Sequence, residues 1–105
     1  MKNIIYGLFD DTYLEGLYTI QELKDLDELM YKYVFNKTFG NTDEKFYGLT
    51  SGEYYKLTSD FEYKSVVELE TELTKKQILK VIDHDFIFDT MGILKVLCKT
   101  RSVFK

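Results

Sequence analysis

The sequence predicts a single α+β domain, an antiparallel β-sheet with helices packed on one of its faces. Three observations support this fold class. Residues Thr19–Val34 have the spacing of an amphipathic helix, with apolar side chains three and four residues apart. Residues Phe61–Thr71 alternate between apolar and polar side chains, as a half-buried strand does. Short β-rich segments separated by turn residues fill much of the rest, and 105 residues are enough for one domain with its own core.

The first third of the chain predicts a hairpin that leads directly into the long helix. Asn3–Phe9 and Tyr13–Tyr18 are β-rich, and the polar residues between them are typical of a turn. Thr19 and Glu22 have the spacing of a capping box, in which each side chain accepts a hydrogen bond from the backbone N–H of the other residue. We expect the helix to continue without interruption to Val34.

The remaining elements are shorter. Lys45–Leu49 and Glu53–Thr58 are predicted to form a second hairpin, followed by the strand Phe61–Thr71. Thr74 begins a short helix with a second capping box, T-x-x-Q, that ends near His84.

The C-terminal part of the chain is open to two interpretations. Asp85–Asp89 resembles a strand, and residues 90–105 fit either a helix or a hairpin. A turn at Met91-Gly92 favours the hairpin. The predicted order is therefore hairpin, helix, hairpin and strand, short helix, and C-terminal hairpin or helix.

Composition and charge restrict the function. The chain has nine Tyr, eight Phe and a single Arg, but no Trp, Pro or Ala, which indicates an AT-rich coding genome such as that of a low-GC bacterium. No apolar run approaches the roughly 20 residues of a membrane span. Cys98 is the only cysteine, so an intramolecular disulfide is excluded and a reducing, cytoplasmic environment is expected.

The sequence contains no recognisable catalytic or metal-binding motif. Phosphate-binding glycine loops, nucleophile elbows and paired cysteines are absent. Asp83, His84 and Asp85, with Asp89 nearby, are the densest set of possible metal ligands, but their spacing matches no known metal site. We therefore expect no enzyme activity, metal or cofactor. The alternative is a small enzyme with a site near His84 and Cys98.

Charge is distributed unevenly along the chain. Residues 1–72 hold 15 acidic residues against seven lysines, whereas residues 73–105 hold three acidic residues against six lysines and Arg101. Glu68, Glu70 and Glu72 recur at every second residue, which on a strand places them on one face about 6.7 Å apart. Such a face either keeps the protein soluble or docks on a basic groove. The predicted partner-binding residues are Glu62, Glu68, Glu70, Glu72, Asp25, Asp27 and Glu28.

The basic C-terminal region supports two other hypotheses. Its cationic residues are Lys75, Lys76, Lys80, Lys95, Lys99, Arg101 and Lys105. A nucleic-acid-binding accessory protein could use them to contact phosphates, although the acidic remainder of the chain makes direct nucleic-acid binding the less favoured hypothesis. Alternatively, the basic region of one copy could meet the acidic region of another copy, which would give a homo-oligomer.

In size, acidity and coding bias, the sequence is similar to small accessory proteins of phages and plasmids. Among these are inhibitors of host nucleic-acid-handling proteins, including anti-CRISPR proteins, which often use acidic surfaces. The resemblance implies a non-enzymatic protein that docks an acidic surface on the basic nucleic-acid-binding groove of a host protein.

Overall fold

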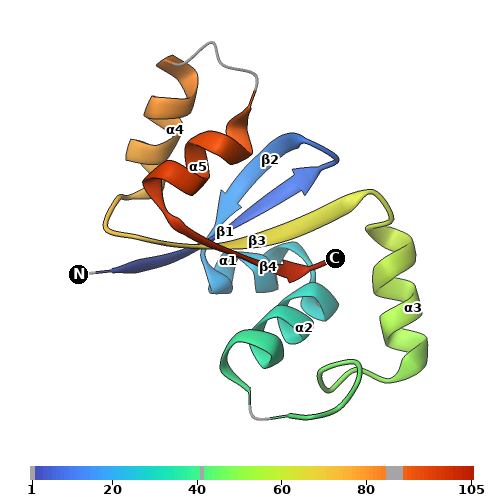
Figure 1. Ribbon diagram of the computed structural model, residues 1–105. Coiled ribbons are helices and arrows are strands. Elements are labelled where there is room, and N and C mark those ends of the chain that lie inside the picture. The colour runs from blue at the N-terminus through green and yellow to red at the C-terminus, as the bar shows by residue number, and fades with distance from the viewer. Residues whose placement is uncertain (1, 41, 85–88) are drawn as a thin grey trace.

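The computed structural model of this chain describes residues 2–40, 42–84 and 89–105 (Figure 1). Its centre is a four-stranded antiparallel sheet with the strand order β2-β1-β3-β4. The predicted α+β class with an antiparallel sheet is confirmed. The strands are β1 (Asn3–Asp10), β2 (Tyr13–Tyr18), β3 (Lys64–Thr71) and β4 (Lys99–Phe104).

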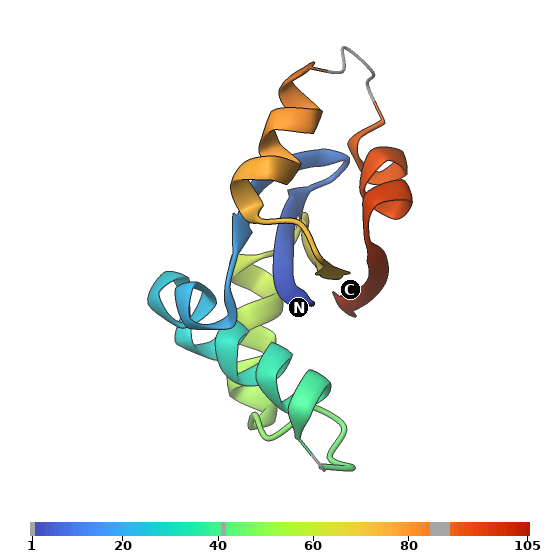
Figure 2. The same cartoon turned by 90° about the vertical axis from the view of Figure 1, so that its left-hand side faces the viewer.

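Helices cover both faces of this sheet. The helices in the described ranges are α1 (Ile20–Leu26), α2 (Glu28–Phe39), α3 (Ser51–Asp60), α4 (Lys75–His84) and α5 (Thr90–Leu97). Figures 1 and 2 show α4 and α5 on one side of the sheet and the other three on the opposite side. The expectation that all helices pack on one face is therefore wrong in this detail.

The central strands explain why both faces need a cover. Tyr6, Leu8 and Val66 belong to a core that α1, α2 and α3 complete. Ile5, Phe9, Leu17, Val67 and Leu69 belong to a second core, which α4 and α5 complete. Because neighbouring side chains of a strand point to opposite faces, a strand that is apolar at consecutive positions must be covered on both sides.

The expected long helix is two helices with a break at Asp27. The Asp27 backbone is extended, with φ −161° and ψ 121°, and its N–H donates to the Leu23 carbonyl at the end of α1. Its carboxylate accepts a hydrogen bond from the Met30 N–H at 2.9 Å and so caps α2. Asp is among the best N-cap residues, so it can end one helix and begin the next without losing hydrogen bonds.

The expected hairpin between residues 45 and 58 is wrong. Residues 45–48 form turns, and α3 follows. Thr50 and Glu53 form a capping box with N···O distances of 3.0 and 3.1 Å. The sequence contains this T-x-x-E signal, but the aromatic and β-favouring residues after it suggest a strand. The capping box and the packing of Leu57 in the core stabilise the helix instead.

The C-terminal region also differs from expectation. The capping box of Thr74 and Gln77 begins α4 as predicted. Met91 and Gly92 lie in α5, with Asp89 as its N-cap, so the favoured hairpin at Met91-Gly92 is wrong and the alternative, a helix, is present and is followed by β4. Of the strand predicted at Asp85–Asp89, residues 85–88 lie outside the described residues.

An ion pair joins the two helical layers. Lys75 of α4 lies 2.5 Å from the carboxylate of Glu22 in α1. This hydrogen bond to Lys75, and next the backbone hydrogen bond from Thr19, lowers the pKa of Glu22 to about 2. A single carboxylate thus caps α1 and connects it to the helix that covers the opposite face of the sheet.

We predict that Asp27→Ala lowers the free energy of unfolding by about 1 kcal/mol, because the first turn of α2 loses its cap. Asp27→Asn keeps a side-chain oxygen in place and should cost less. Chemical denaturation monitored by circular dichroism measures both. Equal stability of the alanine variant and the wild type would contradict the capping role.

Glu22 should make stability dependent on acid. Its folded-state pKa of about 2 lies below the ordinary value of 4.5, so its stabilising contribution is complete above pH 4.5. The contribution is lost as the pH falls towards 2. We predict that the stability difference between the wild type and Glu22→Gln is constant from pH 6 to 5 and shrinks below pH 4. Denaturation curves across this range check the prediction, and a difference that persists at pH 2 would contradict it.

Candidate functional site

The glutamates predicted on the third strand have cationic partners. Arg101 of β4 lies 3.0 Å from the Glu68 carboxylate, and Lys2 lies 3.3 Å from Glu70. The Glu68 side chain is only 12% exposed. These two carboxylates share one face of β3, as the alternation predicts, but much of their charge is neutralised within the sheet.

The other predicted binding residues lie elsewhere. Asp25 and Glu28 are exposed near the junction of α1 and α2, where Asp27 is occupied as a helix cap. Glu72 is exposed just beyond the end of β3, and Glu62 precedes its start. Glu62 and Glu72 thus flank opposite ends of β3, and the six-residue step from Lys64 to Glu70 alone covers about 20 Å along the strand. The structure therefore divides the predicted residues among three regions instead of bringing them together.

A group of carboxylates lies at one end of the sheet. There the turn between β1 and β2, the residues just before β3 and the C-terminal Lys105 meet around a hollow of about 500 Å³. The Asp11 N–H donates a hydrogen bond to the Tyr63 carbonyl at 3.0 Å and holds the two turns together. The lining residues are Asp10, Asp11, Glu62, Tyr63, Lys64, Ser65 and Lys105.

Both lysines of this hollow are engaged. Lys64 is paired with Glu15, and its ammonium lies 3.4 Å from the Asp10 carboxylate. The hydrogen bond to Glu15, and then the one to Asp10, raises the pKa of Lys64. The Lys105 ammonium donates to the carbonyl oxygens of Phe61 and Glu62, at 2.6 and 2.5 Å.

Two carboxylates at this end remain free. Within the described part of the chain, neither Asp11 nor the Glu62 side chain has an ion-pair partner, and both residues are exposed. Asp89, the exposed cap of α5, lines with Asp11 a neighbouring hollow of about 360 Å³. The local charge is therefore negative although lysines are present.

Two exposed tyrosines accompany these carboxylates. Tyr13 begins β2 and is 71% exposed, and Tyr63 precedes β3 and is 73% exposed. Tyrosine is enriched at protein interfaces because it buries a large rigid ring and also offers a hydroxyl. We call this region the acidic end, defined by Asp10, Asp11, Glu62, Asp89, Tyr13 and Tyr63.

Of the residues of the acidic end, only Glu62 is among the partner-binding residues that the sequence predicts. The sequence predicts Asp10 and Asp11 as ordinary turn residues and Tyr63 as part of a strand. No local pattern indicates that the β1–β2 turn lies beside Tyr63. That proximity follows from the pairing of Asp10 with Lys64 across two strands 54 residues apart.

A second polar cluster lies at the C-terminal end of α2. Tyr6 is fully buried there, and within the described residues its hydroxyl and that of Thr38 have no hydrogen-bond partner of normal geometry. Burial raises the pKa of Tyr6 to about 12, while the adjacent Thr38 hydroxyl lowers it in part. A hollow of about 310 Å³ above them is bordered by Thr38, Glu68 and Arg101.

We predict that Tyr6→Phe leaves the free energy of unfolding unchanged or raises it by about 1 kcal/mol. The reason is that removing a buried hydroxyl without a partner relieves its desolvation cost. Tyr13→Phe, at an exposed hydroxyl, is the control and should have no effect. Thermal and chemical denaturation measure both, and a loss of more than about 1 kcal/mol for Tyr6→Phe would contradict the prediction.

Within the described part of the chain, the residues considered for catalysis do not come together in a site. Cys98 is buried in the core beside α4 and α5, and burial raises the pKa of its thiol, which disfavours the nucleophilic thiolate. Asp83 is exposed on α4, and Asp89 caps α5. The His84 side chain and Asp85 lie outside the described part. Among the residues described, no group of three or more His, Cys, Asp or Glu could hold a metal ion.

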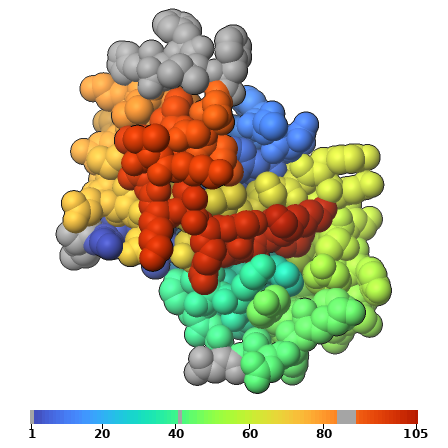
Figure 3. Space-filling view, viewed as in Figure 1, coloured from blue at the N-terminus to red at the C-terminus, as the bar shows by residue number. Residues whose placement is uncertain are grey.

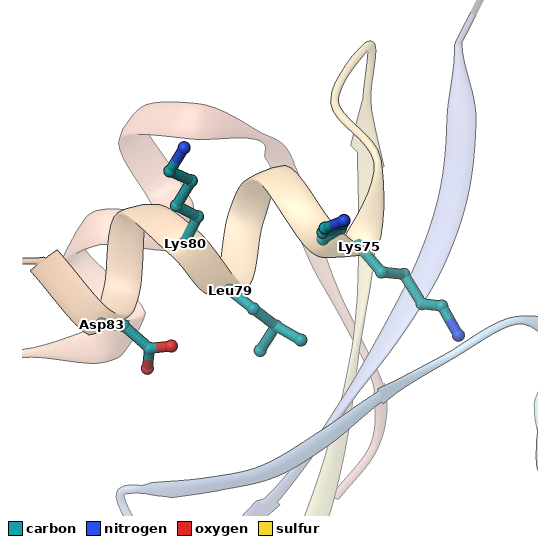
Figure 4. A pocket seen from close by; sticks show the side chains of 5 residues that line it. Lys75, Leu79, Lys80 and Asp83 are labelled. Carbon is teal, nitrogen blue, oxygen red and sulfur yellow. The ribbon is translucent and has the colours of Figure 1, made fainter.

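The cationic residues are also separated by the fold. A hollow of about 650 Å³ beside α4 is lined by Lys75, Lys76, Lys80, Leu79 and Asp83. Figure 4 shows the side chains that line it. Lys75 is already paired with Glu22. Lys95 lies on α5, Lys99 and Arg101 lie on β4, and Lys105 lies at the acidic end. In the described ranges these cations are thus distributed over α4, α5, β4 and the residue after β4.

Comparison of the chain with protein-family models, curated proteins and solved structures found no match. The helices of the described segments include none with the length and apolar character that crossing a membrane requires.

Proposed function

We propose that this chain is a non-enzymatic protein-binding protein that docks its acidic end onto a basic surface of another protein. The observation that carries the proposal is the combination of free carboxylates at Asp11 and Glu62 with the exposed rings of Tyr13 and Tyr63. Buried aromatic anchors supply most of the free energy of association in protein interfaces, and surrounding charges steer the encounter.

The acidic end is suited to binding because its backbone is fixed before a partner arrives. The hydrogen bond from Asp11 to the Tyr63 carbonyl joins one turn to the other. Lys105 ties the C-terminus to the carbonyls of Phe61 and Glu62. A surface that is already ordered loses less conformational entropy on binding.

The partner class follows from the chemistry of the carboxylates. Asp and Glu side chains bind the same Lys and Arg groups that hold phosphates, so an acidic protein can occupy a groove made for nucleic acid. The composition of the chain, which is similar to that of phage and plasmid accessory proteins, supports an inhibitor of this anti-CRISPR-like kind. The proposed target is the basic nucleic-acid-binding groove of a host protein.

The test is affinity capture from an extract of the native cells, with the captured proteins quantified by mass spectrometry. The double variant Asp11→Lys/Glu62→Lys is compared with the wild type. We expect a basic protein that the wild type captures to be depleted about tenfold or more by the variant, because opposite charges become like charges. The retained complex should also weaken as salt is raised.

Asp43→Lys/Glu44→Lys is the matched control, at carboxylates that belong neither to the acidic end nor to helix α2. It changes the net charge of the chain by the same amount at two other exposed carboxylates. Capture should survive this change, and circular dichroism should show both variants folded. Equal loss in the two double variants would indicate a general charge effect, and undiminished capture by Asp11→Lys/Glu62→Lys would refute the proposed surface.

A further inference from the structure

Helix α2 has two apolar stripes, only one of which is covered by the fold. Met30, Tyr33 and Val34 form the buried stripe. Tyr31, Phe35 and Phe39 recur at every fourth residue along the second stripe, and neighbouring rings in this row have centroids 5.5 Å apart. Tyr31 is partly buried against the core and lies under the Lys24 ammonium, so Phe35 and Phe39 are the exposed members. Phe35 is 38% exposed and Phe39 is 48% exposed. We call Tyr31, Phe35 and Phe39 the outer stripe.

The outer stripe continues onto the sheet. Phe39 and Ile4, which is 39% exposed, line the same hollow at the C-terminal end of α2. Figure 3 shows the teal surface of α2 directly below the red strand β4. Phe35, Phe39 and Ile4 are thus exposed apolar side chains of one region, and contiguous exposed apolar patches are candidate interaction sites.

The two ends of the outer stripe differ in charge, although Lys24 lies over the Tyr31 ring at one end and the cations at the other end are ion-paired. Near its N-terminal end, Asp25 and Glu28 are exposed, and no described residue forms an ion pair with either. Near its C-terminal end, the cations are the outermost groups. Lys2 is 66% exposed against 32% for Glu70, and Arg101 is 55% exposed against 12% for Glu68.

We propose that two copies of this chain associate through α2, packed antiparallel about a two-fold axis that passes beside Phe35. Phe35 lies four residues from both Tyr31 and Phe39, so the rotation places it against Phe35 of the second copy. It also places Tyr31 against Phe39 of the second copy. The interface is self-complementary, as a two-fold symmetric contact requires.

Charge complementarity favours a second copy of the chain, packed antiparallel, as the partner of the outer stripe. Antiparallel packing brings the end with Asp25 and Glu28 onto the end where Lys2 and Arg101 are outermost, and it does so twice. It also places the two helix dipoles antiparallel and side by side, which is the favourable arrangement. Parallel packing would instead bring like charges together at both ends.

The dimer is independent of the proposed function. The outer stripe shares no residue with the acidic end, so association through α2 does not use Asp11, Glu62, Tyr13 or Tyr63. A dimer would carry two acidic ends, and a partner with two basic sites would be bound with higher avidity.

Sedimentation velocity of the purified chain over a range of concentrations tests the proposal. We expect the wild type to shift from monomer to a species of twice the monomer mass as concentration rises. Phe35→Glu puts two carboxylates against each other at the axis and should raise the dissociation constant of the dimer by about a hundredfold or more. Phe39→Glu is a second variant of the same kind.

Val96→Glu is the matched control, because Val96 is an 85% exposed apolar residue on α5 and the charge change is the same. It should dimerise like the wild type, and circular dichroism should show all variants folded. A wild type that stays monomeric at its highest soluble concentration would overturn the proposal. A Phe35→Glu variant that still dimerises, or a Val96→Glu variant that does not, would overturn it as well.

Discussion

The register between β1 and β3 is the constraint on which the rest of the structure depends. The two strands pair antiparallel over their whole lengths, from Asn3 opposite Thr71 to Asp10 opposite Lys64. In this register Tyr6, Leu8 and Val66 face one helical layer, and Ile5, Phe9 and Val67 face the other. A slip by one residue would exchange the two sets, so neither layer would find its apolar surface.

The same register determines which charges are free. Glu68 lies opposite Arg101 and is paired with it, and Lys64 lies opposite Asp10. Carboxylates within strands thus meet cations from neighbouring strands. Asp11 and Glu62 lie just outside the paired region, in turns that the sheet brings together. Free negative charge is consequently present at this end of the sheet, whereas Glu68 and Glu70 on the strand that the sequence indicated are ion-paired.

Local signals were reliable where a few neighbouring residues decide the structure. The capping boxes at Thr19 and Thr74 and the first hairpin appear as predicted. The strand predicted over Phe61–Thr71 is present but begins at Lys64, and both of its faces are covered instead of one. The errors occurred where such signals compete. Asp27 reads as a solvated residue in a helix, but its capping hydrogen bond to Met30 divides that helix. The segment after Thr50 has strand-favouring aromatic residues, yet the capping box and the burial of Leu57 make it helical.

The sequence by itself determined the fold class, the helix starts, the acidic balance and the lack of a familiar catalytic motif, because these depend on residue types and short spacings. Only the tertiary structure decided which side chains are free to bind. The ion pair with Arg101, 33 residues away, makes Glu68 less available to a partner, whereas Asp11 lies beside Tyr63 through a backbone hydrogen bond. The outer stripe was present in the sequence as aromatic residues four apart. Its exposure became evident only when Met30, Tyr33 and Val34 were seen to occupy the core, since a helix with two apolar sides can bury only one of them against a single sheet.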